Sequence, residues 1–146
     1  MRIRLIAVGK MKEPSWRERA EAYAARLKPF ASLELMQARD ADAEQEGERI
    51  LKALEKTPGR VFALAEEGRA MTSDQLAQAI SQLRDSSTEA TFIVGGAYGL
   101  SDAVKSRADA LLSLSPMTFT HEMARVLLLE QLYRAFSILH GSGYHH

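Results

Sequence analysis

The chain of 146 residues contains no cysteine, and this excludes disulfides, thiolate metal sites and cysteine nucleophiles together. No apolar run approaches the roughly 20 residues that a membrane-spanning helix needs. The apolar runs near the N-terminus are too short and too charged for a secretory signal. His and carboxylate side chains at zinc-ligand spacing are also lacking. We therefore expect a cytoplasmic protein that has no membrane association and binds no metal.

An excess of charge of one sign is lacking as well, because 19 Lys and Arg residues balance 19 Asp and Glu residues. The overall charge therefore does not attract nucleic acid. Residues 1–30 nevertheless hold eight cationic side chains against three glutamates. This basic segment either contacts a phosphate backbone or forms the solvated face of a helix, and the sequence favours the second interpretation.

Segments typical of strands and helices alternate along the chain, whose length fits one domain over residues 1–146. Residue patterns predict strands at 2–8, 32–37, 60–65, 90–94 and 111–114. Helices are predicted from Pro14 to Pro29, over 42–56, after Thr72, from Ser101 to 110, and over 122–140. Residues 38–47 are of doubtful order, and we expect a loop there that leads into a helix. This alternation indicates βαβ units, hence an α/β fold with a parallel sheet covered on both faces.

Two loops that follow predicted strands are candidate ligand sites. Residues 95–99 (GGAYG) lie between a strand and a helix, where open α/β sheets bind ligands. They lack the spacing of a dinucleotide fingerprint and the lysine of a P-loop, and a tight structural turn explains them about as well. Residues 114–120 (LSPMTFT) offer polar groups beside an apolar wall, which suits a purine. An ordinary connection between a strand and a helix is the alternative for that loop.

The last predicted helix is apolar on nearly all sides and must therefore be buried. Because a domain of this size has limited room for it, a homodimer interface is the economical explanation. Glu130 and Arg134 lie one turn apart on this apolar background, either as a structural ion pair or as a functional pair. The chain ends in Tyr144, His145 and His146, whose rings can stack on an unpaired base.

Together these segments resemble one family, the small bacterial 23S ribosomal RNA pseudouridine-N3 methyltransferases of the knotted SPOUT class. The matching stretches are residues 1–10, 92–100, 112–119, 130–136 and 144–145, with Tyr23, Arg26, Leu27, His121, Arg125 and Val126 between them. They cover the full length of the chain in register. The C-terminal set is specific in order and spacing.

The resemblance implies a trefoil knot in the C-terminal half, a homodimer, and S-adenosylmethionine as methyl donor. The substrate it implies is a pseudouridine of 23S rRNA in the assembled ribosome. In relatives the tail of one subunit completes the site of the other. By motif position, the residues expected to hold the cofactor are Leu64, Gly95, Gly96, Leu114, Ser115, Pro116, Met117, Thr118 and Phe119.

The same resemblance gives catalytic roles to Glu130, Arg134, Tyr144 and His145. The N3 proton of pseudouridine must leave as the methyl group is transferred, so a positioned base helps, whereas the thioether leaves as a neutral molecule and needs no acid. We expect His145 or Glu130 to assist proton removal. Arg134 would hold an RNA phosphate or the base, and Tyr144 would pack against the base.

The chain departs from the family at two positions. Ala65 stands where relatives usually carry an acidic residue, which weakens the cofactor contact expected there. His146 stands where they tend to have Arg or Lys, so a phosphate contact at that position would depend on pH. Two other functions compete with this one. An NAD- or flavin-dependent enzyme is disfavoured by the missing phosphate fingerprint, and a non-catalytic ribosome-associated RNA-binding protein of the same fold is the alternative.

Overall fold

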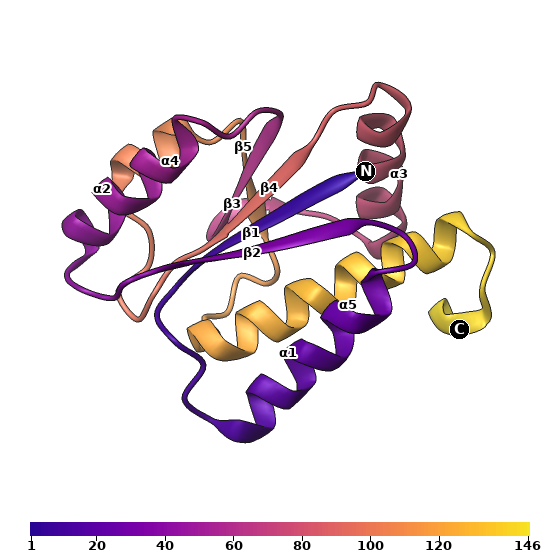
Figure 1. Ribbon diagram of the computed structural model, residues 1–146, viewed down its shortest axis with the longest axis horizontal. Coiled ribbons are helices and arrows are strands. Elements are labelled where there is room, and N and C mark those ends of the chain that lie inside the picture. The colour runs from indigo at the N-terminus through magenta and orange to yellow at the C-terminus, as the bar shows by residue number, and fades with distance from the viewer.

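The computed structural model describes residues 1–146 and shows a five-stranded sheet with helices on both faces (Figure 1). The strands lie in the order β2-β1-β4-β3-β5, and every pairing is parallel. The predicted α/β class with a parallel sheet is confirmed. The strands are β1 (Arg2–Val8), β2 (Ser32–Ala38), β3 (Arg60–Ala70), β4 (Ala90–Val94) and β5 (Ala110–Ser113).

The helices form two layers (Figure 1). They are α1 (Pro14–Leu27), α2 (Ala43–Leu54), α3 (Ser73–Asp85), α4 (Asp102–Arg107) and α5 (His121–Leu139), followed by a 3-10 turn, η1 (Gly143–His145). Helices α1, α3 and α5 cover the sheet face that holds the larger hydrophobic core, and α2 and α4 cover the smaller core on the other face. None of these helices combines the length and the apolar character needed to cross a membrane.

The helices begin where the sequence places capping residues. The side chains of Asp42, Thr72, Ser101 and Thr120 each accept a hydrogen bond from the backbone N–H three residues further on. Thr72 forms a complete capping box, because the Gln75 side chain in turn accepts from the Thr72 backbone N–H at 2.9 Å. Local chemistry therefore fixes the start of each of these helices.

Strand β3 is longer than predicted. It pairs with β5 as far as Leu64, bulges, and resumes pairing at Arg69. A Cβ atom at Gly68 would lie 2.7 Å from the carbonyl carbon of Leu111, so only glycine allows this close approach. Residues 66–70 are mostly polar and gave no strand signal. Helix α4 ends at Arg107, three residues earlier than expected. The loop expected over 38–47 is confined to residues 39–42, because β2 runs to Ala38 and α2 begins at Ala43.

The last helix, for which a domain of this size was expected to have limited room, is largely buried within the chain. Helix α5 lies between α1 and α3 and packs on the sheet, so its apolar sides meet neighbours of the same chain. Leu128, Leu132 and Phe136 have no exposed surface. The Phe136 ring stacks on Phe30 with centroids 6.0 Å apart. Burial within the chain thus explains most of the apolar pattern that was assigned to a dimer interface.

Candidate functional site

A cavity of about 730 Å³ lies at the carboxyl ends of β4 and β5, beside the bulge in β3. Its walls come from residues 64–66 within β3, the glycine loop 94–100 at the end of β4, the loop 114–120 after β5, and the first turn of α5. Parallel strands end at one edge of the sheet, which is where α/β folds bind ligands. The volume falls within the range of roughly 300–1,000 Å³ that is typical of small-molecule sites.

The fold brings the residues expected to hold the cofactor into one place. Eight of the nine line this cavity, although they come from three separate segments: Leu64, Gly95, Gly96, Leu114, Ser115, Met117, Thr118 and Phe119. Pro116 is exposed and does not line it. The Ser115 hydroxyl accepts a hydrogen bond from the Met117 N–H at 3.0 Å, which shapes the loop after β5.

Sequence reasoning missed several charged and polar residues of this cavity. Glu66 lines it, and its carboxylate accepts a hydrogen bond from the Thr118 hydroxyl at 2.8 Å. Lys105 also lines it and pairs with Glu67 at 2.7 Å, a hydrogen bond that lowers the pKa of the Glu67 carboxyl. The available signal was the pair of glutamates directly after the predicted third strand. Glu66 supplies, one residue later, the acidic group that Ala65 lacks.

The glycines of the loop after β4 are explained by the packing of the loop itself. A Cβ atom at Gly95 would lie 2.9 Å from the carbonyl carbon of Gly99. At Gly96 it would lie 3.0 Å from a Val8 methyl and 3.2 Å from both Glu46 carboxylate oxygens. The tight-turn interpretation therefore suffices for Gly95, whereas Gly96 is required by close packing of the loop against β1 and α2. Both residues also form part of the cavity wall.

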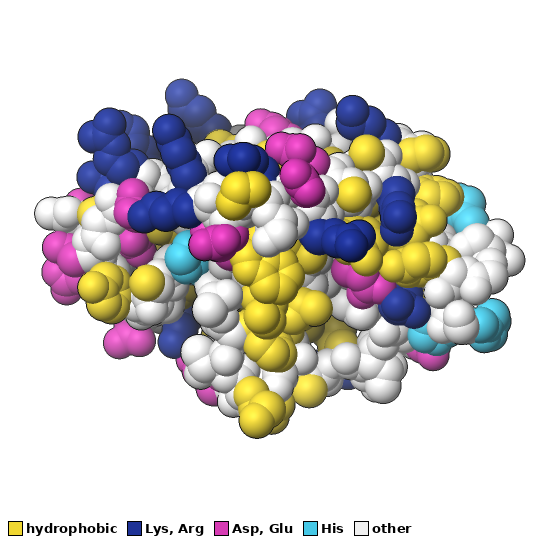
Figure 2. Space-filling model, turned by 90° about the horizontal axis from the view of Figure 1, so that it is seen from below, with side chains coloured by type: hydrophobic (Ala, Val, Ile, Leu, Met, Phe, Trp, Pro, Cys, Tyr) yellow, Lys and Arg dark blue, Asp and Glu magenta, His cyan; other side chains and the backbone are white.

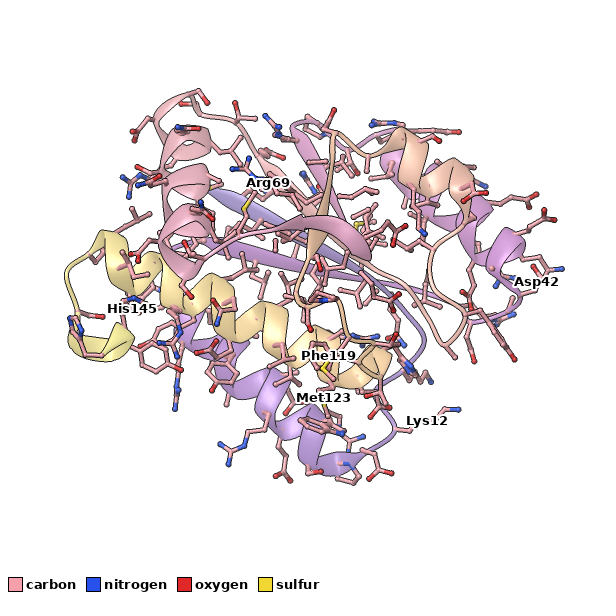
Figure 3. All side chains as sticks on the ribbon, turned by 180° about the vertical axis from the view of Figure 1, so that it is seen from behind. Lys12, Asp42, Arg69, Phe119, Met123 and His145 are labelled. Carbon is pink, nitrogen blue, oxygen red and sulfur yellow. The ribbon has the colours of Figure 1, made fainter.

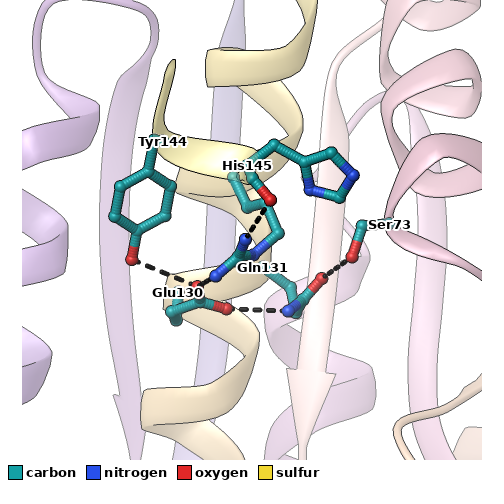
Figure 4. A network of polar contacts seen from close by, with 6 residues as sticks. Ser73, Glu130, Gln131, Tyr144 and His145 are labelled. Atoms are coloured by element: carbon teal, nitrogen blue, oxygen red, sulfur yellow. Dashed lines mark hydrogen bonds and ion pairs between the residues drawn. The ribbon is translucent and has the colours of Figure 1, made fainter. Parts of the chain in front are cut away.

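The four expected catalytic residues form a separate polar network around the C-terminal tail (Figure 4). Arg134 donates to Glu130 through Nε at 3.0 Å and through Nη2, and the Tyr144 hydroxyl donates to the same Glu130 oxygen at 3.1 Å. The other Glu130 oxygen accepts from Gln131 at 2.7 Å. Arg134 also donates to the His145 carbonyl at 3.4 Å. The ion pair within α5 is thus present, and its two residues hydrogen-bond to Tyr144 and His145 of the tail.

Two groups of this network, Tyr144 and Arg134, have raised pKa values. Burial raises the pKa of the Tyr144 hydroxyl, and the nearby Tyr23 hydroxyl and Glu130 carboxylate raise it further. The hydrogen bonds to Glu130 raise the pKa of Arg134. Tyr144 and Arg134 therefore keep their protons at neutral pH. His145 differs, because its Nδ1 is buried without a partner and its Nε2 lies 3.8 Å from Asp74.

The network and the cavity do not meet within one chain. Ala124 lines the cavity, whereas Glu130 lies nearly two turns further along α5, about 9 Å away at a rise of roughly 1.5 Å per residue. Figure 3 shows Phe119 and Met123 near the first turns of α5, whereas His145 lies beside its last turns, where the tail folds back along the helix. The structure thus divides the expected site residues into two clusters.

Comparison with known proteins identifies the family. The family model described as "Predicted SPOUT methyltransferase" matches residues 1–145. The chain belongs to the SPOUT methyltransferase family. SPOUT methyltransferases use S-adenosylmethionine as methyl donor. The expectation of a SPOUT methyltransferase, made from the sequence, is confirmed.

Relatives of the same length support this SPOUT assignment. The chain is 45% identical over 154 residues to "Ribosomal RNA large subunit methyltransferase H" of Geotalea daltonii, with all of both chains covered. It is 48% identical over 153 residues to the protein of the same name from Pelobacter propionicus, again with all of both chains covered.

Two solved structures share the SPOUT fold. A probable methylase family protein from Haemophilus influenzae Rd KW20 has a TM-score of 0.55 at 12% identity, covering 95% of this chain and 66% of that one. TrmJ from Z. mobilis ZM4 has a TM-score of 0.52 at 15% identity, covering 91% and 68%. At such low identity these structures show a common fold alone.

Proposed function

We propose that this chain transfers the methyl group of S-adenosylmethionine to N3 of a pseudouridine in 23S rRNA, on assembled ribosomes in the cytoplasm. The observation that carries the proposal is the convergence of eight expected cofactor residues on one cavity. Full-length identity of 45–48% to proteins named ribosomal RNA large subunit methyltransferase H supports the RNA substrate. The alternative of a non-catalytic RNA-binding protein does not require such a cavity.

The chemistry of the cavity fits this cofactor. The apolar side chains of Leu64, Leu114 and Phe119 suit the flat faces of an adenine, and the backbone groups of the loops suit its polar edges. The Glu66 carboxylate is an acceptor for sugar hydroxyls or a counter-charge for the cofactor's cationic groups. When bound there, the cofactor supplies an electrophilic methyl group.

A homodimer would join the two clusters. Met123 and Leu127 are half-buried on the outward side of α5, and hydrophobic side chains gather in the middle of this face (Figure 2). Two copies of α5 that pack antiparallel about Leu127 would bring the cavity end of one subunit to the Glu130 network of the other. Such a two-fold contact is the usual form of a homodimer. The separation of the clusters within one chain therefore supports a site built by two subunits.

A trefoil knot in the C-terminal half is part of the proposal. In the sheet β3 lies between β4 and β5, so the chain must cross β3 on its way from one to the other. The loops that follow β4 and β5 nevertheless line the same cavity. Helix α5 then returns to pack between α1 and α3. This path is consistent with threading of the last segment past the glycine loop.

His145 is the residue that we assign to proton removal. Both Glu130 oxygens already accept hydrogen bonds, whereas Nδ1 of His145 has no partner. A buried acceptor without a partner is costly, and a role in function accounts for its retention. As N3 gains the methyl group, its proton would pass to the imidazole of His145, whose side chain is one-third exposed. Glu130 and Arg134 would hold the tail in place, and Tyr144 would pack against the base.

The test of the proposed function is methyl transfer to ribosomes from a strain that lacks this modification. Labelled S-adenosylmethionine is supplied with 70S ribosomes or free 50S subunits, and mass spectrometry maps the product nucleoside. We expect a single N3-methylated pseudouridine in 23S rRNA. Cofactor binding without transfer would instead support the non-catalytic alternative, and binding of NAD in place of S-adenosylmethionine would contradict the cofactor.

Replacing His145 tests its role separately. We expect His145→Ala to lower kcat by about a hundredfold, because a positioned base contributes at least that factor to proton transfer. Calorimetry should show unchanged affinity for S-adenosylmethionine, since His145 does not line the cavity. Ser142→Ala is the matched control, an exposed residue of the same tail whose side chain makes no hydrogen bond. Equal kcat values for the two variants would show that another group accepts the proton.

A further inference from the structure

Arg26, in the last turn of α1, has a guanidinium group that lies over two aromatic rings. It lies 5.3 Å from the ring centroid of Tyr23 and 5.8 Å from that of Tyr133. The side chain is exposed, and it makes no ion pair and no side-chain hydrogen bond. The rings therefore hold the guanidinium in place while all five N–H donors stay open to a ligand.

The rings under Arg26 continue into the tail network. Tyr133 meets Tyr144 edge-on with centroids 4.6 Å apart, and the Arg134 guanidinium lies 4.9 Å from the Tyr144 ring centroid. Tyr23, Tyr133 and Tyr144 thus form one tyrosine platform with a guanidinium at each end. Lys and Arg side chains border the hydrophobic patch on the face shown in Figure 2. Arg26 belongs to the same surface as the tail.

The two guanidinium groups of the platform differ in what they leave free. Arg134 uses Nε and Nη2 on Glu130 and Nη1 on the His145 carbonyl, so the tail and α5 occupy it. Its positive charge is balanced by the Glu130 carboxylate. Arg26 has neither a hydrogen-bond partner nor a counter-charge. Of the two, Arg26 is therefore the one available for an anion from outside the chain.

We infer that Arg26 is a substrate-binding residue whose guanidinium takes an rRNA backbone phosphate beside the target nucleotide. The inference rests on the proposed function and assigns to Arg26 the phosphate contact that the sequence suggested for Arg134. A planar guanidinium matches two phosphate oxygens at once, and rings that already hold the side chain in place reduce the entropy lost on binding. Such a contact fixes the register of the RNA and reads no base.

The test compares Arg26→Gln with Arg26→Lys and with Arg19→Gln. Arg19 is the matched control, because it is exposed on the same helix and has no ring contact. In steady-state methyl transfer to 70S ribosomes, we expect Arg26→Gln to raise the KM for ribosomes about tenfold, the effect of one charge-assisted contact. The kcat, the affinity for S-adenosylmethionine and the thermal midpoint should not change. Arg26→Lys should raise the KM less than Arg26→Gln does, since lysine keeps the positive charge but lacks the paired N–H donors of the guanidinium.

Cosedimentation with ribosomes measures the same contact without catalysis. Wild-type binding should weaken as salt rises, and Arg26→Gln should reduce the slope of log affinity against log salt by about 0.7–0.9, the value for one phosphate. An Arg26→Gln variant that binds ribosomes as Arg19→Gln does would overturn the inference. So would a fall in kcat at constant KM, which would indicate positioning of the tail.

Failure of the proposed function gives a different result in the methyl-transfer assay from failure of the Arg26 inference. In that case the wild-type chain transfers no methyl group, whatever residue stands at position 26. Ribosome binding that still depends on Arg26 would then support the contact, and binding that does not depend on it would reject it.

Discussion

A chain that ends at Gly141 should still bind S-adenosylmethionine yet lose methyl transfer to ribosomes by about a thousandfold. The deletion removes η1, including the hydrogen bond from Tyr144 to Glu130 and the unpartnered Nδ1 of His145. Loss of a base and of its alignment together accounts for a factor of about 10²–10⁴. None of the deleted residues lines the cavity, so cofactor affinity measured by calorimetry should stay the same.

Mixed dimers would show whether the tail acts at the cavity of its own subunit or at that of the partner subunit. Ala97 is exposed and lines the cavity, so Ala97→Trp should block the cofactor without disturbing the core. The tail-deleted chain and the Ala97→Trp chain should each be inactive alone. When the two are coexpressed, a mixed dimer has one intact cavity facing one intact tail, and random pairing should restore about a quarter of wild-type activity. No recovery on mixing would mean that the tail does not act across the interface.

The largest effect on stability is expected for Phe136→Ala. The Phe136 ring is fully buried in the larger core and stacks on Phe30. Removal of a buried phenyl group leaves a cavity that the neighbouring helices fill only in part, and it should lower the free energy of unfolding by about 3–5 kcal/mol. Chemical denaturation at one fixed protein concentration measures the change, because dimer stability depends on concentration.

Leu35→Ala is the matched control for this prediction. Leu35 lies on β2 with 60% of its surface exposed, so its truncation should change the free energy of unfolding by about 0.5 kcal/mol or less. If the two variants had similar effects, Phe136 would not be the packing residue that the structure indicates.

Much of the fold could be predicted from local patterns. Proline at the start of α1, the capping residues Thr72, Ser101 and Thr120, and the apolar spacing within each helix are local signals, and they gave element positions close to the observed ones. Strand order was not predictable, because each parallel pairing joins distant segments. The second half of β3 was missed because its polar residues pair with β5 only beyond a bulge.

The burial of α5 shows a limit of composition arguments. The helix is apolar on nearly all sides. This pattern does not distinguish burial against a partner chain from burial between the sheet, α1 and α3 of the same chain. Placement of α1 and α3 on either side of α5 decides the matter for most of its surface, and only arrangement in space supplies that information. Half-buried Met123 and Leu127 are what remains for a partner.

The candidate site was predictable only through the family resemblance. Leu64 is an ordinary strand residue in the sequence, and no spacing rule connects it with loops 30 and 50 residues further on. Glu66 and Lys105 were missed because charged residues near strand ends and on short helices are common. The division into cavity and tail network also has no local signal, since Ala124 and Glu130 belong to one continuous helix.

The order of strands in the sheet affects how the chain folds during its synthesis on the ribosome. Ile3 of β1 pairs with Ala90 of β4. The first strand to be synthesised, β1, therefore cannot pair with β4 until residues 90–94 have left the ribosome. The outer neighbour of β1, the earlier-made β2, can pair sooner but leaves a half-built sheet with an open inner edge. Non-local parallel pairing of this kind slows folding and exposes strand edges to aggregation. The nascent chain must therefore stay soluble through more than half of its own translation before its central strands can meet.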